Sequence, residues 1–118
     1  MWKHSNSMIK NNEFISYILD MLHDFGIVTA KAMFGGYGVY REGIIFAIVV
    51  DDAFYIKADD SNRAFFEKEG LSKFSYIKKG KECFMSYYMA PEEAIDDKNT
   101  LCFWAQRGYD AALRSRKT

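Results

Sequence analysis

The apolar positions of residues 14–25 repeat with the period of an α-helix. Glu13, Asp20 and Asp24 lie off the apolar face. Asn11 or Asn12 is placed to cap a helix, and Gly26 is placed to end one. The sequence therefore predicts an amphipathic helix from about residue 11 to residue 24. Its apolar face carries Phe14, Ile15, Ile18, Leu19, Leu22 and Phe25.

Short apolar runs with strand character follow this helix. Residues 27–33 form an extended segment that leads into a glycine-rich bend, and strands are predicted at about 37–40, 44–50 and 54–57. The turns between the strands, at 41–43 and 51–53, are short. Short turns join antiparallel strands, so we expect a three-stranded antiparallel meander.

The second half of the chain alternates helix and hairpin signals. Asp59 and Asp60 can cap a short helix that ends at Gly70, and a hairpin follows with arms at 73–77 and 82–88. Pro91 opens a helical turn, and Asn99 or Thr100 can cap the last helix. Gly108 inside that helix costs about 1 kcal/mol in helix propensity, which indicates close packing there.

The predicted element order is α-β-β-β-α-β-β-α. An antiparallel sheet of about five strands with helices on one face is a two-layer α+β fold. We expect residues 1–118 to form a single domain, with its core at about 13–113 and frayed ends.

The strand at 44–50 is apolar on both faces. Regular alternation points Ile44, Phe46, Ile48 and Val50 one way, and Ile45, Ala47 and Val49 the other way. Helices on one side would leave the second set exposed to water. A second subunit, a partner protein or the terminal helices would have to cover it, and a homodimer is the favoured interpretation.

The bend at residues 33–40 has three glycines within four positions. Glycine permits positive φ and close backbone approach, so a structural kink between helix and sheet is the first interpretation. A surface contacted by a partner is the alternative. A dinucleotide-binding loop is disfavoured because it needs a strand before its glycines and a helix after them.

Composition and charge narrow the function classes. Aromatic residues make up 17% of the chain, and 16 basic residues balance 16 acidic ones. Nucleic-acid binding needs a basic face, so the short basic segments at 78–81 and 114–117 are interpreted as a solvated turn and a frayed terminus. No apolar run approaches the roughly 18 residues of a membrane span, and Cys83 and Cys102 form no CxxC motif. We expect a cytoplasmic protein with free, buried thiols.

The residue types needed for catalysis do not cluster in the sequence. Cys83 lies beside apolar residues, as a core cysteine does, and His23 has no companion ligand. The acidic pairs fall at turns and helix starts, where capping explains them. No zinc, calcium, Walker or nucleophile-elbow motif is present. We expect no enzyme activity, cofactor, metal site or small-molecule substrate.

Several segments, taken in order, resemble the N-terminal domain of the TfoX/Sxy family of competence regulators. The resemblance covers about residues 13–113 and is carried by segments 31–40 (KAMFGGYGVY), 46–47, 54–57, 60–63, 86–94 and 104–105. It implies an α+β domain of the kind also seen in secretion-chaperone-like folds. It also implies a non-enzymatic role in regulating competence genes, with full-length members acting alongside a DNA-bound activator. Such full-length regulators carry a second, C-terminal domain, for which 118 residues leave no room.

These observations favour a small regulatory or adaptor module that binds another protein through an aromatic sheet. The alternatives are a chaperone-like homodimer that shields a peptide or client, and, least favoured, a direct DNA-binding factor. Aromatic residues on strands are also common in cores, which is the competing explanation for each candidate. The candidate contact residues are Lys31, Phe34, Gly35, Gly36, Tyr37, Tyr40, Tyr87 and Tyr88.

Overall fold

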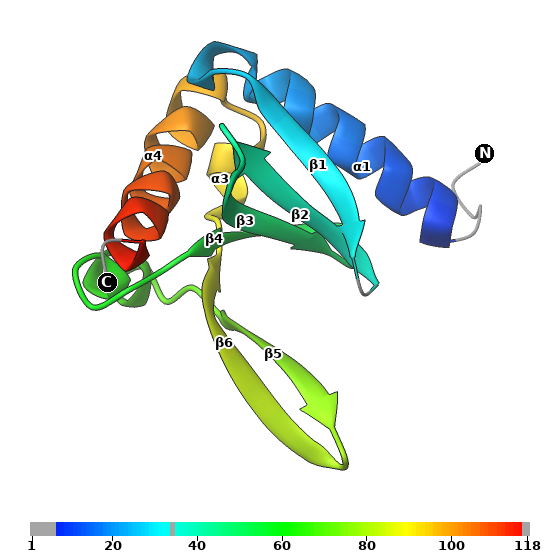
Figure 1. Ribbon diagram of the computed structural model, residues 1–118, viewed down its shortest axis with the longest axis vertical. Helices are drawn as coiled ribbons and strands as arrows, with labels where there is room; N and C mark the ends of the chain where they lie inside the picture. Colours follow the sequence, from blue (N-terminus) through cyan, green and yellow to red (C-terminus); the bar gives the residue numbers. More distant parts are fainter. Residues whose placement is uncertain (1–6, 34, 117–118) are drawn as a thin grey trace.

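A computed structural model describes residues 7–33 and 35–116 of the chain. In this part, six strands form one antiparallel sheet in the order β1-β2-β3-β4-β6-β5 (Figure 1). The predicted α+β class is confirmed. The strands are β1 (Val28–Met33), β2 (Gly36–Arg41), β3 (Ile44–Val50), β4 (Ala53–Lys57), β5 (Lys73–Lys78) and β6 (Lys81–Met89).

The strand beyond the predicted five is β1. It pairs with β2 from Val28 opposite Arg41 to Met33 opposite Gly36. Because β1 is an edge strand and half of its residues are exposed, its sequence lacks the apolar run that marks β3. The segment expected only to lead into the bend is therefore part of the sheet.

The helices begin and end at slightly different residues than predicted. The first, α1 (Ser7–Met21), starts before Asn11, and a 3₁₀ turn, η2 (His23–Phe25), follows it. The cap of the last helix is Asp97, whose carboxylate accepts the Thr100 N–H at 3.1 Å. The described helices also include α2 (Arg63–Lys68), α3 (Glu92–Ile95) and α4 (Lys98–Ser115).

Two-residue turns of described residues join β2 to β3, β3 to β4 and β5 to β6. Glu42-Gly43, Asp51-Asp52 and Lys79-Gly80 all have positive φ at both residues. This is the geometry of the primed turns, whose twist matches that of paired strands. The predicted antiparallel meander with short turns is confirmed.

The helices pack on one face of the sheet, around Phe46 and Phe54, both at most 1% exposed. Helix α4 crosses β3 and β4 at Gly108. A Cβ at this position would lie 2.8 Å from the Phe46 carbonyl oxygen and 2.6 Å from Cγ2 of Ile56. The predicted close packing at Gly108 is confirmed.

A β-bulge changes which residues of β3 share a face. Val39 lies opposite Ala47, but Tyr40 lies opposite Ile45, so Phe46 is the extra residue in β3. Phe46, Ala47 and Val49 consequently join the core under the helices, while Ile48 belongs to a second cluster. The regular alternation predicted for residues 44–50 is therefore wrong beyond Phe46.

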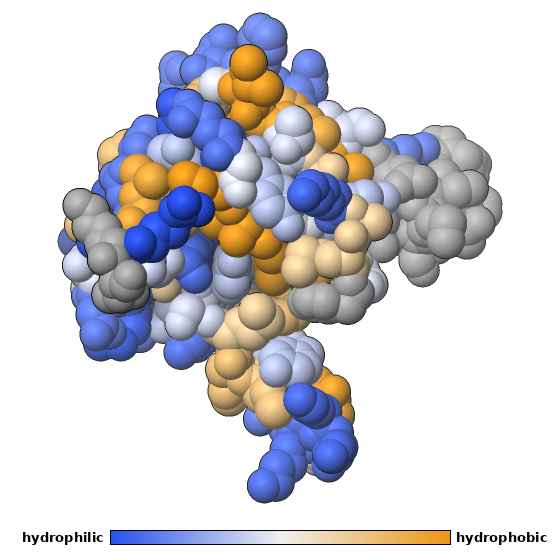
Figure 2. Space-filling view, in the orientation of Figure 1, coloured by the Kyte–Doolittle hydropathy of each residue, from blue (hydrophilic) through white to orange (hydrophobic). Residues whose placement is uncertain are grey.

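The second face of β3 is covered in part by the chain itself. Strands β5 and β6 form a hairpin, here called the arm (residues 73–89), that projects from the body (Figure 1). Phe74 and Tyr87 of the arm cluster with Ile48, which is only 2% exposed. Figure 2 shows hydrophobic residues where the arm joins the body and hydrophilic residues at its tip.

Candidate functional site

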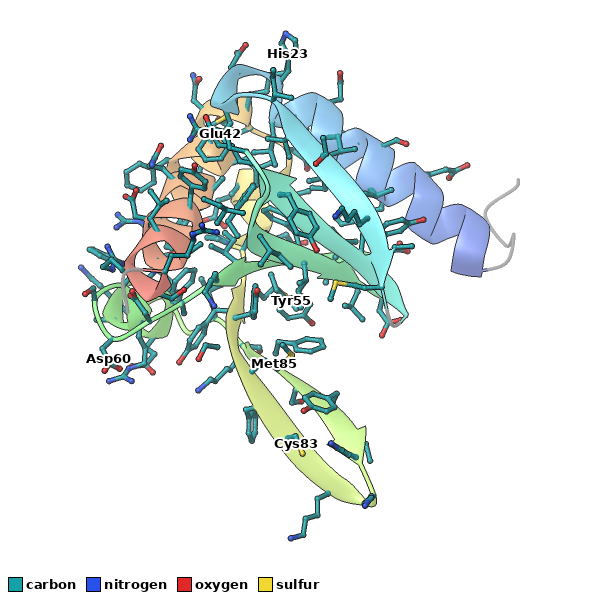
Figure 3. The ribbon with its side chains drawn as sticks, viewed as in Figure 1. His23, Glu42, Tyr55, Asp60, Cys83 and Met85 are labelled. Atoms are coloured by element: carbon teal, nitrogen blue, oxygen red, sulfur yellow. The ribbon has the colours of Figure 1, made fainter. Side chains whose placement is uncertain are left out.

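A groove of about 650 Å³ opens on the helix-free face, between the ends of β3 and β4 and the arm. Figure 3 shows Tyr55 and Met85 pointing into the space between these elements. The groove exists because β4 pairs with β6, with Tyr55 opposite Met89, and β6 then carries the arm away from the sheet. Its lining residues are Val50, Asp51, Tyr55, Phe74, Ser75, Tyr76 and Met85.

The groove wall is aromatic. The rings of Tyr55 and Phe74 meet edge to face at 5.0 Å, and those of Phe74 and Tyr76 stack at 6.3 Å. Tyr76 is 40% exposed. Burial and, secondarily, the Asp51 carboxylate raise the pKa of Tyr55, so its hydroxyl remains a hydrogen-bond donor at neutral pH.

Lysines lie over tyrosine rings on the same helix-free face. The Lys31 ammonium is 5.1 Å from the ring centre of Tyr40, and the Lys57 ammonium is 5.2 Å from that of Tyr87. Burial and the neighbouring Tyr40 phenol raise the pKa of Tyr87, in that order of importance. The pairs Lys31–Tyr40 and Lys57–Tyr87 thus combine aromatic rings with positive charge on this face.

Three of the eight predicted contact residues come together here: Lys31, Tyr40 and Tyr87. Tyr88 instead faces the helices, because it lies opposite Ile56 of the core. It is 5% exposed, and its hydroxyl donates to a Glu67 carboxylate oxygen at 2.8 Å. Tyr37 also packs against the helix-side core. We leave Tyr37 and Tyr88 out of the proposed surface.

The remaining predicted contact residues belong to the bend. Gly35 is exposed and has φ of 68°. A Cβ on Gly36 would clash with the Val49 carbonyl oxygen, so Gly36 is needed for the close approach of β2 and β3. Phe34 lies outside the described residues. Gly36 therefore fits the interpretation of the bend as a structural kink, without a contact to a partner.

The described residues that line the groove are not among the predicted contact residues. Tyr55, Phe74, Tyr76 and Met85 were assigned to strands but not to a surface. Phe74 and Tyr76 are two residues apart in β5, and Met85 and Tyr87 are two residues apart in β6, so each pair lies on one face of its strand. This spacing was the only sign in the sequence of a shared apolar surface. These side chains line a groove only because β4 pairs with β6, and this pairing joins segments about 30 residues apart.

The His, Cys, Asp and Glu side chains of the described residues form no metal-binding group. Within residues 7–33 and 35–116, no group of three or more His, Cys, Asp or Glu could hold a metal ion. His23, Asp60 and Cys83 lie in separate regions of the molecule (Figure 3). Burial raises the pKa of the Cys102 thiol, which disfavours the nucleophilic thiolate.

Neither cysteine is buried as predicted. Both are free and half-buried, and Cys83 belongs to β6 of the arm rather than to the core, opposite the exposed Tyr76. No helix in the described part of the chain is long and apolar enough to cross a membrane.

Comparison with known proteins identifies relatives of this chain. Protein Sxy of Escherichia coli is 24% identical over 99 residues, which are 84% of this chain and 47% of that protein. DNA transformation protein TfoX1 of Aliivibrio fischeri is 30% identical over 67 residues, which are 57% of this chain and 32% of that protein. The chain thus matches less than half of the length of either relative.

The family model for the TfoX N-terminal domain matches residues 20–112, a range that includes every strand and most of α4. The predicted resemblance is therefore confirmed, and the chain belongs to the TfoX N-terminal domain family.

Proposed function

We propose that this chain is a non-enzymatic regulatory module for DNA transformation that acts by binding another protein through its helix-free face. Membership of the TfoX N-terminal domain family supports a regulatory role. The name of one relative, DNA transformation protein TfoX1, supports the process. The two free cysteines agree with action in the reducing cytoplasm.

The groove is the main evidence that the helix-free face binds another protein. Protein interfaces are enriched in tyrosine, phenylalanine and methionine, and the groove is lined by Tyr55, Phe74, Tyr76 and Met85. Anchoring residues of a partner bind best in such desolvated pockets. Lys31 and Lys57 flank this surface over tyrosine rings, where they can meet acidic groups at the rim.

A domain exchange tests the proposal. In Aliivibrio fischeri, the segment of TfoX1 that matches this chain would be replaced by the chain, and transformants would be counted. We expect the exchange to retain transformation well above a strain without TfoX1. If the exchanged protein accumulates in folded form but yields no transformants, the proposed role in transformation is wrong.

A matched pair of variants tests the groove within the same exchange. Tyr76→Ser removes a half-exposed aromatic anchor from the groove, so we expect transformation to fall about tenfold. Ile27→Ser removes an apolar side chain that is 84% exposed and lies outside the groove, so it should have little effect. Equal transformation by both variants would contradict a role for the groove.

A further inference from the structure

Two exposed phenylalanines flank an arginine on the helix layer. Phe65 of α2 is 43% exposed and Phe103 of α4 is 55% exposed. The Arg107 guanidinium carbon lies 3.6 Å from the ring centre of Phe65 and 4.4 Å from that of Phe103. The ring of Trp104 is also near, at 5.3 Å. The guanidinium group is thus held among three aromatic rings.

The charge of Arg107 is not compensated within the described chain. Two neighbouring arginines are paired, Arg63 with Asp60 and Glu67, and Arg114 with Asp59. Arg107 forms no ion pair among the described residues, and its buried Nε has no hydrogen-bond partner there. Burial lowers the pKa of Arg107, although a guanidinium group stays charged in proteins.

We propose that Phe65, Phe103 and Arg107 form a second docking site, for a protein segment that carries an acidic residue beside an aromatic or branched apolar residue. The carboxylate would accept hydrogen bonds from the terminal Nη atoms of Arg107, since Nε is buried. The apolar neighbour would cover the exposed faces of the two phenylalanine rings.

Two physical features fit this occupant. The aromatic rings hold the guanidinium plane in place, so little side-chain entropy is lost when a carboxylate binds. Arginine and aromatic residues together are also the usual composition of binding hot spots.

The surrounding charge disfavours a nucleic acid at this site. Asp110 of α4 lies about one turn after Arg107, Glu67 of α2 lies two residues after Phe65, and the chain has no net charge. A polyanion would meet these carboxylates, whereas a segment with a single acidic residue can avoid them.

The test is a selection of random 12-residue peptides on phage against the purified full-length chain. We expect the recovered peptides to be enriched in Asp or Glu adjacent to Phe, Trp, Leu or Ile. A fluorescent synthetic copy of the most frequent peptide would then be titrated with each protein variant. Arg107→Gln should weaken its binding about tenfold, as should Asp→Asn or Glu→Gln within the peptide.

Controls separate docking from folding and from the groove. Phe103→Ser should also weaken binding, because it removes an exposed ring without touching the charge, and thermal unfolding would check that each variant is folded. Tyr76→Ser alters the groove and should leave peptide binding unchanged.

Three outcomes would overturn the proposal: recovered peptides without an acidic excess, equal binding by folded Arg107→Gln, or displacement of the peptide by a single-stranded 20-mer oligonucleotide. Because the readout is peptide affinity rather than transformation, failure here leaves the proposed function standing, and the reverse also holds.

Discussion

Asp59 connects the end of the sheet to both α2 and α4. Its carboxylate accepts the backbone N–H groups of Ser61 at 3.0 Å and Asn62 at 3.1 Å. It also accepts two hydrogen bonds from the Arg114 guanidinium group, at 2.7 and 3.0 Å. Arg114 was predicted to lie in a frayed tail, but α4 continues to Ser115 and this contact holds its last turn beside α2.

We predict that Asp59→Asn lowers the free energy of unfolding by about 1 kcal/mol at pH 7, because the ion pair with Arg114 is lost while the asparagine amide oxygen can still accept the turn N–H groups. The Arg114 hydrogen bonds hold the pKa of Asp59 below its usual value. Such a carboxylate stabilises the fold fully above its unfolded pKa of about 3.9 and loses this effect as pH falls through the folded pKa. Urea unfolding at several pH values measures the difference, which should shrink below about pH 4.

Asp60→Asn is the matched control for this prediction. Its side chain is 93% exposed and pairs only with the half-exposed Arg63 among the described residues, so its removal should change stability little. A difference between wild type and Asp59→Asn that stays constant from pH 7 to pH 3 would contradict the assigned ion pair.

At the scale of elements, the arm makes few buried apolar contacts beyond its base. Its base is held by the cluster of Ile48, Phe74 and Tyr87, whereas Ile77 and Phe84 farther along are 70% and 58% exposed. Local opening is expected where few apolar contacts are buried. The turn at Lys79-Gly80 should therefore contribute strongly to the stability of the pairing between β5 and β6.

We predict that Lys79→Asn stabilises the arm. Lys79 has φ of 52°, in the left-handed region, which asparagine adopts more readily than lysine, and Asn-Gly is a preferred sequence for this turn. Amide hydrogen exchange in β5 and β6 should slow about two- to fivefold. Lys78→Asn, one residue earlier in the strand, should give no such slowing, and equal slowing by both variants would contradict the turn assignment.

At the scale of the whole molecule, the chain itself covers part of the β3 face that a second subunit was expected to cover. The homodimer was favoured because the second face of β3 was expected to be exposed. Phe74 and Tyr87 of the same chain cover Ile48 on that face, and what remains is a groove rather than a flat apolar sheet. Closed twofold pairing is then not needed to bury the strand.

We predict that the purified chain is a monomer of 13.7 kDa at micromolar concentration. Light scattering coupled to size exclusion measures the mass. A stable species of twice this mass would contradict the prediction. In that case the same measurement on Ile77→Ser and Phe84→Ser would show whether the exposed apolar residues of the arm form the contact.

The sequence by itself determined the local structure and the family. The apolar periodicity of residues 14–25, the run at 44–50 and the short turns each act within a few neighbouring residues, and their elements form within a few residues of the predicted positions. The ordered motifs from the glycine bend to the last helix were enough to indicate the TfoX N-terminal domain.

The tertiary structure decided which side chains face outward. The bulge at Phe46 and the pairing of β4 with β6 place Tyr87 on the helix-free face and Tyr88 in the core, although the two are adjacent in the sequence. A shift of one residue in register would exchange them. Register depends on contacts between segments far apart in the chain, which no local pattern contains. The groove, and the stacking of Arg107 between Phe65 and Phe103, arise only from that long-range packing.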